Sequence, residues 1–160
     1  MDLKGKVAVV TGSSVVLGRE IAIGFGREGS RVVVNYSQSE PEAKQTLEDV
    51  KATGAEAILA RGNMADEADV KNLMATAAKQ FGGIDVLVNN AARTYFVPAK
   101  KLADVTDQMW DDIMSLNVRG AFICCREAAN YLNDPSHIIN IGSTAGVNGD
   151  GSSIPYAASK

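Results

Sequence analysis

Three residues that could exchange a proton with a substrate oxygen lie in the last part of the chain. Tyr156 and Lys160 are one helical turn apart, so on a helix both side chains project from the same face. A phenol has an ordinary pKa of about 10, and a nearby ammonium favours the phenolate form. Ser143 follows the apolar run 136–142, which predicts a strand ending just before its hydroxyl. Together the three residues could exchange a proton with a carbonyl or alcohol oxygen. Tyr-x-x-x-Lys alone, however, is more often an ordinary pair on a helix surface.

A glycine-containing loop near the N-terminus stands where a phosphate could bind. The apolar run 6–10 predicts a strand buried on both faces, the loop 11–18 follows it, and helical spacing begins at Leu17 and continues through Ile21 and Phe25. A helix that starts directly after a strand offers free N–H groups and positive potential to a pyrophosphate. A plain tight turn also uses glycine, so the loop alone leaves both interpretations open.

Strands and helices then alternate along the chain. Further strands are expected at 31–36, 56–61, 85–89 and 136–142. This alternation predicts an α/β fold, a doubly wound parallel sheet in the Rossmann order 3-2-1-4-5, with a ligand crevice between strands 1 and 4.

The helices between these strands have recognisable starts and apolar faces. A capping box at 39–42 would open a helix with Ala43, Leu47 and Val50 inward, and a second helix would bury a stripe over 70–81. Thr106 would cap a long helix that runs to about Leu132, before Pro135 separates it from the fifth strand. The inward face of that helix would contain Trp110, Ile113, Ala121, Cys124 and Ala128, with the polar Asn117 among them.

Composition narrows the classes of partner. The chain has 160 residues, of which 46% are hydrophobic and 22% charged, as expected for one globular domain. A net charge of −3 gives no support for nucleic acid or an anionic membrane, and no apolar run approaches the ~20 residues of a membrane span. The adjacent Cys124 and Cys125 cannot form a disulfide framework and favour a reducing, cytoplasmic location. With one histidine and two neighbouring thiols, no metal site is expected.

In this order the motifs resemble the short-chain dehydrogenase/reductase family over the whole chain. The shared segments are Thr11–Gly18, Asn89-Asn90-Ala91, Asn117, Ser143 and Tyr156-x-x-x-Lys160. Within the family, the second strand VVVNY is similar to that of glucose 1-dehydrogenases and 3-oxoacyl-carrier-protein reductases. The resemblance implies an NAD(P)-dependent oxidoreductase that transfers a hydride between a nicotinamide cofactor and a secondary alcohol, sugar hydroxyl or ketone. It also implies a small-molecule substrate and a homo-oligomer at full length.

The resemblance also implies residue roles. Tyr156 would be the general acid/base, Lys160 would tune it and hold the nicotinamide ribose, and Ser143 would orient the substrate oxygen. Asn117 would keep a water behind Lys160, or it could simply be a buried amide bonded to backbone. The implied cofactor-binding residues are Gly12, Ser14, Leu17, Gly18, Asn35, Tyr36, Ser37, Asn63, Met64, Asn90 and Ala91, together with Tyr156 and Lys160.

The sequence departs from the family pattern in three places. Val16 replaces the middle glycine of the loop. Asn63-Met64 stands where the family usually has an aspartate that hydrogen-bonds the adenine of the cofactor. The chain ends at Lys160, where the family continues with further strands and a substrate lid. We therefore expect 1–160 to be the N-terminal part of a single dinucleotide-binding domain in a protein of roughly 250 residues. This part by itself is expected to be inactive and prone to aggregate.

The cofactor preference and the effect of Val16 depend on few residues. Asn35 replaces the acidic residue that would bind the ribose of NAD and repel the extra phosphate of NADP, so NADP is expected, with NAD also used. Ser37 could meet that phosphate, and no arginine is near in the sequence. Val16 either weakens pyrophosphate binding, which we favour, or points away. Val16 is also the one residue that favours an alternative to the oxidoreductase, namely a cofactor-impaired family member with a structural or regulatory role.

Overall fold

Five parallel strands form one sheet in the order β3-β2-β1-β4-β5 in the computed structural model, which describes residues 2–160. Their bounds are Val7–Val10 (β1), Arg31–Tyr36 (β2), Ala57–Arg61 (β3), Ile84–Asn89 (β4) and Leu132–Asn140 (β5). The α/β class, the doubly wound parallel sheet and the strand order are as predicted, and the bounds of the first four strands differ from expectation by at most one residue.

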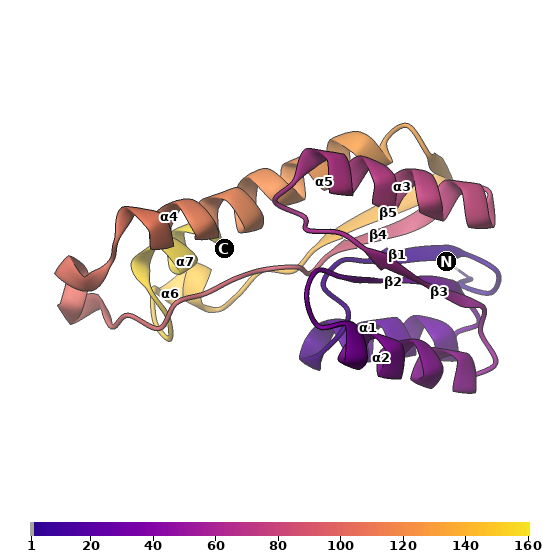
Figure 1. Cartoon of the computed structure of the whole chain (residues 1–160), viewed down its shortest axis with the longest axis horizontal. Helices are drawn as coiled ribbons and strands as arrows, with labels where there is room; N and C mark the ends of the chain where they lie inside the picture. Colours follow the sequence, from indigo (N-terminus) through magenta and orange to yellow (C-terminus); the bar gives the residue numbers. More distant parts are fainter. Residues whose placement is uncertain (1) are drawn as a thin grey trace.

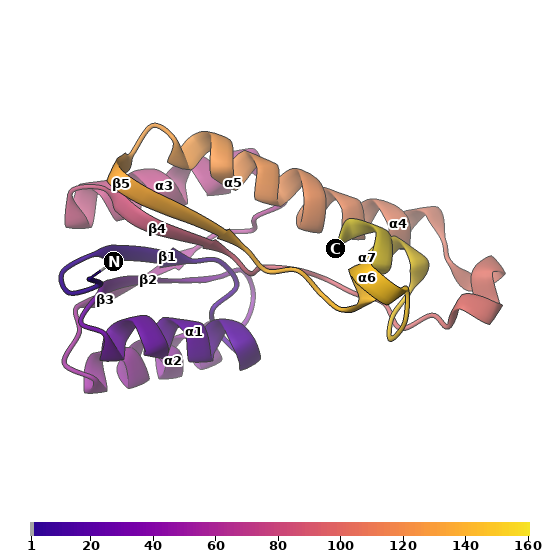
Figure 2. The ribbon, with the colours of Figure 1, turned by 180° about the vertical axis from the view of Figure 1, so that it is seen from behind.

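Helices cover both faces of this sheet (Figure 1). Helices α1 (Val16–Arg27) and α2 (Glu40–Ala52) lie on one face, while α3 (Glu67–Phe81) and α5 (Ala121–Ala128) lie on the other, as the reverse view also shows (Figure 2). All four residues of β1 are fully buried, because its side chains alternate between two apolar layers. The core is accordingly split into two clusters, one under each pair of helices.

Helix α3 follows the sequence pattern throughout. Its stripe Val70, Leu73, Met74, Ala77 and Phe81 is buried, as predicted. Asp66 caps its N-terminus by accepting hydrogen bonds from the N–H groups of Ala68 and Asp69, at 2.8 and 3.1 Å. Gly82 ends it in the left-handed conformation, at φ +89°.

The long helix expected from Thr106 to about Leu132 is divided into three pieces. Thr106 caps α4 (Asp107–Met114) by accepting from Met109 N at 3.2 Å, a π-helical turn η2 (Ser115–Gly120) follows, and α5 ends at Ala128. A π turn adds a residue to the helical repeat and rotates the faces before and after it. Ile113, Cys124 and Ala128 are buried as expected, whereas Trp110 is 43% exposed, so its assignment to the inward face is wrong.

Strand β5 begins earlier than expected and contains Pro135, which the sequence suggested as a separator. The β4–β5 pairing passes from Ile84 with Leu132 to Val86 with His137, so an irregularity in β5 takes up the intervening residues. Pro135 is tolerated because it lies in this irregular stretch of a strand at the edge of the described sheet.

Two smaller expectations are also wrong. Ser39 precedes α2 without a side-chain cap hydrogen bond, so the capping box does not form, and Leu47 is only partly buried while Thr46 is fully buried. On α1 the fully buried residues are Gly18, Ala22, Ile23 and Gly26. Of the predicted helical spacing, Ile21 and Phe25 are partly buried against the core, and Leu17 is 50% exposed.

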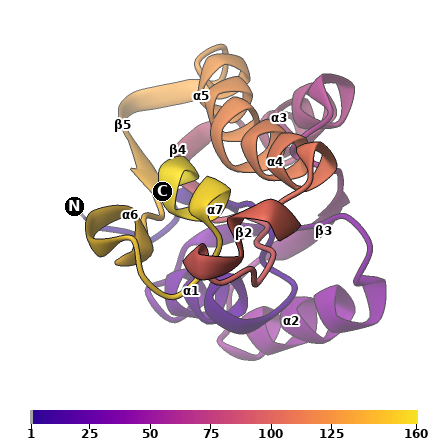
Figure 3. The ribbon, with the colours of Figure 1, turned by 90° about the vertical axis from the view of Figure 1, so that its left-hand side faces the viewer.

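The segments beyond the C-terminal ends of the strands form a lobe. It contains the 3-10 segment η1 (Ala99–Asp104), α4, α6 (Ala145–Asn148) and α7 (Ile154–Ser159). Seen end-on, α4, α6 and α7 gather at this end of the sheet (Figure 3). Within residues 2–160, none of the helices combines the length and the apolar character that a membrane crossing needs.

Candidate active site

The glycine loop after β1 packs its backbone directly against the end of β4. Gly12 has φ +61°, and a Cβ there would lie 2.9 Å from Ala91 Cα. A Cβ on Gly18 would lie 2.5 Å from Asn90 Nδ2 and 2.9 Å from Ser13 Cα. Side chains at Gly12 and Gly18 are therefore excluded, and the loop presents backbone N–H groups at the start of α1.

Asn90 fastens this loop to β4. Its Nδ2 donates to the carbonyl oxygens of Thr11 and Gly12 at 2.9 and 3.0 Å. Thr11 Oγ1 in turn accepts from the backbone N–H groups of Asn90 and Ala91, at 3.0 Å each. Both donors of the Asn90 amide are thus used within the fold, and this residue shapes the crevice between strands 1 and 4.

That crevice is a cavity of about 310 Å³ at the C-terminal edge of the sheet. The predicted cofactor residues that line it are Gly12, Leu17, Gly18, Asn35, Ser37, Asn63, Met64, Asn90 and Ala91. Ser14 and Tyr36 are buried and are not among its lining residues. The cavity lies where open α/β sheets bind their ligands.

Asn35 reaches the cavity with very little of its surface. It is 1% exposed, and its Oδ1 accepts from Gly12 N at 2.9 Å. Its Nδ2 donates to Ala60 O and Gly62 O, at 3.1 Å each. The amide is engaged inside the fold and has no free donor for a cofactor ribose. The substitution Asn35→Asp would set a carboxylate against two carbonyl oxygens, so it would destabilise the loop before it changed any cofactor preference.

Val16 has an unusual backbone. It is the only residue other than glycine with positive φ in the described part of the chain, at +47°, and its side chain is 81% exposed. A β-branched residue in the left-handed region is strained, because Cβ approaches the following carbonyl oxygen. Val15 and Leu17 are also exposed, so this apolar stretch lies at the cavity wall and is not packed on β4.

Lys160 lies at the end of α7 with its ammonium turned toward the sheet. Its Nζ donates to Ile141 O at 2.7 Å, just beyond β5, and its backbone N donates to Tyr156 O at 3.1 Å. Burial lowers the pKa of Lys160. Gly146 permits this packing, because a Cβ there would lie 2.7 Å from Lys160 O.

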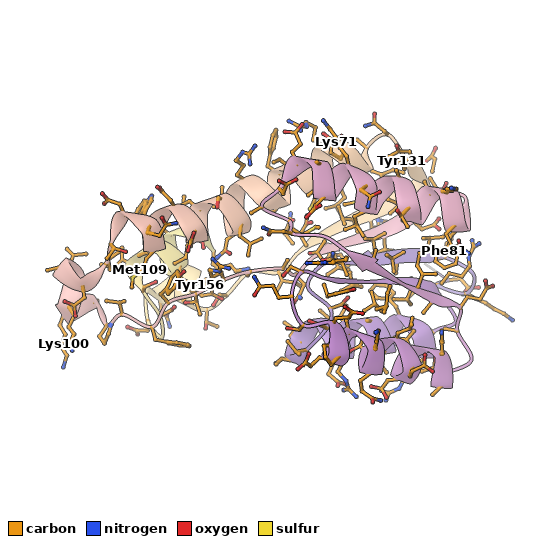
Figure 4. All side chains as sticks on the ribbon, viewed as in Figure 1. Lys71, Phe81, Lys100, Met109, Tyr131 and Tyr156 are labelled. Atoms are coloured by element: carbon orange, nitrogen blue, oxygen red, sulfur yellow. The ribbon has the colours of Figure 1, made fainter. Side chains whose placement is uncertain are left out.

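Tyr156 and Ser143 belong to the same lobe, and both are half-buried. Figure 4 shows Tyr156 at the end of the molecule beyond the strands, with Phe81 and Tyr131 at the opposite end. Ser143 Oγ accepts from Ala145 N at 3.2 Å at the start of α6. α6 packs against α7, so the structure brings Ser143 and the Tyr156–Lys160 helix into one neighbourhood.

Asn117 connects the π turn with the two segments on either side of it. Its Oδ1 accepts from Arg93 N at 2.8 Å, and its Nδ2 donates to Arg93 O at 3.0 Å and to Ser159 Oγ at 2.9 Å. Ser159 Oγ donates onward to Tyr156 O at 2.8 Å. The alternative of a buried amide bonded to backbone is therefore present in the structure. Asn117 also lines a second cavity of about 500 Å³, together with Ser159 and Lys160.

Comparison with known proteins identifies the fold family. The family model described as short chain dehydrogenase matches residues 6–160. The chain belongs to the short-chain dehydrogenase family. A protein from Streptomyces violaceoruber, described as a candidate ketoacyl reductase of the granaticin polyketide synthase, is 39% identical over 155 residues, which cover 96% of this chain and 61% of that protein.

Solved structures of short-chain dehydrogenases agree with this assignment. One from Burkholderia cenocepacia J2315, in complex with NADP, superposes with a TM-score of 0.92 at 32% identity and covers 100% of this chain and 64% of its own. A short-chain dehydrogenase/reductase mutant from Serratia marcescens gives 0.91 at 32% identity, again over 100% of this chain and 64% of its own. The chain thus spans 61–64% of the length of these relatives.

Two arginines of this short-chain dehydrogenase line the site, although the sequence did not single them out. Arg93 lines the main cavity, and Arg61 lines a smaller one beside it. Arg93 follows the Asn89-Asn90-Ala91 motif closely, so its position could have been anticipated. Arg61 ends β3, and its Nε donates to Ser37 O at 3.4 Å, so an arginine lies close to Ser37 in space although none is near it in the sequence.

Proposed function

We propose that the protein is an NAD(P)-dependent oxidoreductase that acts on a secondary alcohol, sugar hydroxyl or ketone. The proposal rests on the close packing of the loop backbone at Gly12 and Gly18, where a Cβ would collide with Ala91 and Asn90 just after β4. A loop without side chains at these positions allows a pyrophosphate to approach backbone N–H groups at the start of a helix. The relative that was solved in complex with NADP supports the same cofactor here.

The residues of the main cavity fit a dinucleotide. Gly12, Leu17 and Gly18 would lie under the pyrophosphate, and Asn63, Met64 and Ala91 would line the adenosine end. Asn90 would act by holding the loop, since its amide donors already bind Thr11 and Gly12. A bound nicotinamide cofactor would supply the hydride chemistry, and the protein would position the reactants and handle the proton.

The proton chemistry is assigned to the lobe. Tyr156 would give a proton to the substrate oxygen during reduction and take one during oxidation, while Ser143 would hydrogen-bond that oxygen. The Lys160 ammonium, fixed by Ile141 O, would favour the phenolate and reach the nicotinamide ribose. Asn117 would position this helix through Ser159, because its hydrogen bonds tie α7 to the π turn.

We place residues 1–160 in a single dinucleotide-binding domain whose partners are a small-molecule substrate and further copies of the same chain. Phe122 and Val118 are 62% and 43% exposed along the η2–α5 surface. Asp111 and Arg119 line one groove with Val118 and Phe122, so two antiparallel copies could pair opposite charges across it. The free cysteines Cys124 and Cys125 fit a reducing compartment such as the cytoplasm.

The test joins cofactor binding with turnover. Calorimetric titration with NADP and NAD should show binding of NADP, and the absorbance of the reduced nicotinamide should change with members of a panel of sugars, alcohols and ketones. The strained Val16 favours the alternative of a cofactor-impaired member with a structural or regulatory role. Absence of binding by both dinucleotides would support that alternative, whereas binding without turnover would leave the chosen substrates in question.

A further inference from the structure

The segment 93–97, which we call the strap, links the main cavity to the lobe. It has no regular secondary structure and extends from the end of β4 toward η1 (Figure 1). Arg93, at its start, lines the main cavity. Phe96, near its end, lines a third cavity of about 350 Å³, whose other wall is the loop 149–152 just before α7. The strap therefore connects the proposed dinucleotide site with the part of the lobe that carries Tyr156.

Successive side chains of the strap face opposite ways. Arg93 and Tyr95 both contact Asp112 on α4. Thr94, between them, is hydrogen-bonded to Ser152 in the loop before α7. This alternation is typical of extended backbone. One face of the strap is thus attached to α4, and the other is attached to the segment that leads into α7.

Three donors converge on the Asp112 carboxylate. Its Oδ2 accepts from Tyr95 Oη at 2.6 Å and from Arg93 Nη1 at 3.1 Å, and its Oδ1 accepts from Gln108 Nε2 at 2.8 Å. The Tyr95 hydroxyl, followed by the Gln108 amide, lowers the pKa of Asp112, and the hydrogen bond to Asp112 raises the pKa of Tyr95. Both shifts lead away from neutral pH, so the carboxylate stays charged and the phenol stays protonated there. An isolated surface ion pair contributes little, but a carboxylate with several charge-assisted hydrogen bonds can fasten the strap to α4.

The backbone of the strap is attached separately at Arg93. Asn117 binds both the N–H and the carbonyl oxygen of Arg93, and its amide also reaches Ser159 Oγ. These bonds hold the first residue of the strap, whereas Asp112 holds the side chains of its first and third residues. Loss of the Asp112 charge should therefore release the strap beyond Arg93 and leave the connection through Asn117 intact.

We propose that Asp112 is a positioning residue, which holds the strap against α4 and thereby keeps the dinucleotide site and the lobe in the geometry needed for turnover. The inference rests on the proposed function and goes beyond it, because Asp112 acts through the strap and not by touching a ligand. Reacting groups must be held near their productive geometry, and a displacement of about 1 Å that arises far from the chemistry can lower a rate by about 10²-fold. The strap can transmit such a displacement, since it forms part of a cavity wall at each end.

Limited proteolysis tests the attachment of the strap independently of activity. Trypsin cleaves after arginine, so cleavage after Arg93 reports how often the strap opens. Asp112→Asn nearly keeps the size of the side chain and removes its charge, and the rate of this cleavage, followed by mass spectrometry, should rise about tenfold or more. Asp112→Glu should keep part of the protection. Asp107→Asn, exposed in the first turn of α4, is the matched control and should leave the rate unchanged.

Turnover by the active enzyme tests whether the strap matters to the reaction. Asp112→Asn should lower kcat about tenfold or more, while calorimetry shows that NADP binding does not weaken, because the glycine loop is untouched. Tyr95→Phe removes one donor and should lower kcat less. The double variant should be no slower than Asp112→Asn alone, because both residues act through one network. A merely structural role would instead lower the thermal midpoint and leave the kcat of the folded enzyme unchanged.

The outcomes separate this inference from the proposed function. Cleavage after Arg93 that Asp112→Asn does not alter would overturn the inference, and so would faster cleavage with an unchanged kcat. Both results would leave the proposed dinucleotide site standing. If Asp112→Asn fails to fold, Tyr95→Phe decides, and normal cleavage and kcat in that variant would overturn the inference. Absence of NADP binding by the unchanged protein would overturn the proposed function, and with it any role of Asp112 in turnover.

Discussion

Lys160 Nζ is bonded to the backbone oxygen of Ile141 at 2.7 Å, which ties the helix that carries Tyr156 to the end of β5. This bond fixes the ammonium at the wall of the second cavity, which both residues line. Burial lowers the pKa of Lys160, and the carbonyl contact offsets part of that cost for the charged form. The relative position of Tyr156 and Lys160 is therefore set by tertiary contacts as well as by their helical spacing.

Replacing Tyr156 with Phe should remove the proposed proton transfer and keep the packing of the ring. Loss of a positioned general acid/base lowers rates by about 10²–10⁴. We expect kcat of the active enzyme to fall within that range, while calorimetry shows unchanged dinucleotide binding. Tyr131→Phe, at the opposite end of the molecule, is the control (Figure 4). A Tyr156→Phe enzyme that retains more than about a tenth of kcat would assign the chemistry to another group.

Lys160→Met should lower kcat as much as Tyr156→Phe does, for a different reason. It removes the proposed electrostatic support for the phenolate together with the ribose contact, so kcat should fall and dinucleotide binding should weaken. Steady-state kinetics combined with calorimetry separates the two effects. Lys79→Met, which is exposed in the last turn of α3, should change neither quantity. Normal turnover by Lys160→Met would contradict the role given to its ammonium.

Val16→Gly should stabilise the protein and tighten dinucleotide binding. Relief of left-handed strain is worth ~1–2 kcal/mol, and the added chain entropy of glycine costs ~0.5–1 kcal/mol, so the free energy of unfolding should rise slightly. A recovered phosphate contact should raise affinity about tenfold or more. Val15→Gly is the matched control, because Val15 has extended backbone at φ −144° and no such strain. Equal dissociation constants for Val16→Gly and the unchanged protein would mean that Val16 faces away from the phosphates.

Asp85 should make the fold sensitive to acid. Burial alone would raise the pKa of Asp85, but Val7 N, the Lys6 ammonium and Asn133 together bring it below its ordinary value. A lowered pKa stabilises the folded state above the unfolded value of about 3.9, and this contribution is lost as the pH falls through the folded pKa. Urea unfolding should show Asp85→Asn less stable by ~1.5–3 kcal/mol at neutral pH, because a charged hydrogen bond is lost.

The difference between Asp85→Asn and the unchanged protein should shrink as the pH is lowered through that window. The exposed Asp104 serves as the control, and Asp104→Asn should have little effect at any pH. A stability difference that stays constant down to acid pH would show that the loss at Asp85 comes from packing and not from charge.

Cys124 and Cys125 should differ in reactivity even though they are adjacent. Burial, with a smaller effect of Cys125, raises the pKa of Cys124 to about 12, so its thiolate is rare at neutral pH. Cys125 is half-buried and lines the second cavity, where Asn89 Nδ2 lies 3.3 Å from its sulfur. Iodoacetamide should modify Cys125 in the folded protein and reach Cys124 only after unfolding. Peptide mass spectrometry checks this order, and equal labelling of both thiols would contradict it.

The alternation of apolar runs, glycines and helical stripes was enough to predict the sheet, its strand order and the buried stripe of α3. The strands and the stripe depend on local periodicity, which is present in the linear chain, and the strand order follows from the handedness and topology rules for alternating strands and helices. The glycine loop and the Tyr156–Lys160 spacing were equally visible, because their chemistry depends on residues close in sequence. Thr106 was recognised as a cap for the same reason, since its partner Met109 is three residues away.

Other features depended on contacts between distant segments. The π turn that contains Asn117 rotates one half of the long helix against the other. The side-chain amide of Asn117 binds Arg93 and Ser159, and neither residue lies near Asn117 in the chain. Asn35 was assigned to the cofactor from its place at the strand end, but the loop after β1 and the end of β3 enclose its side chain. The approach of Arg61 to Ser37 has the same origin, because β2 and β3 are separated in sequence by α2 and meet only in the sheet.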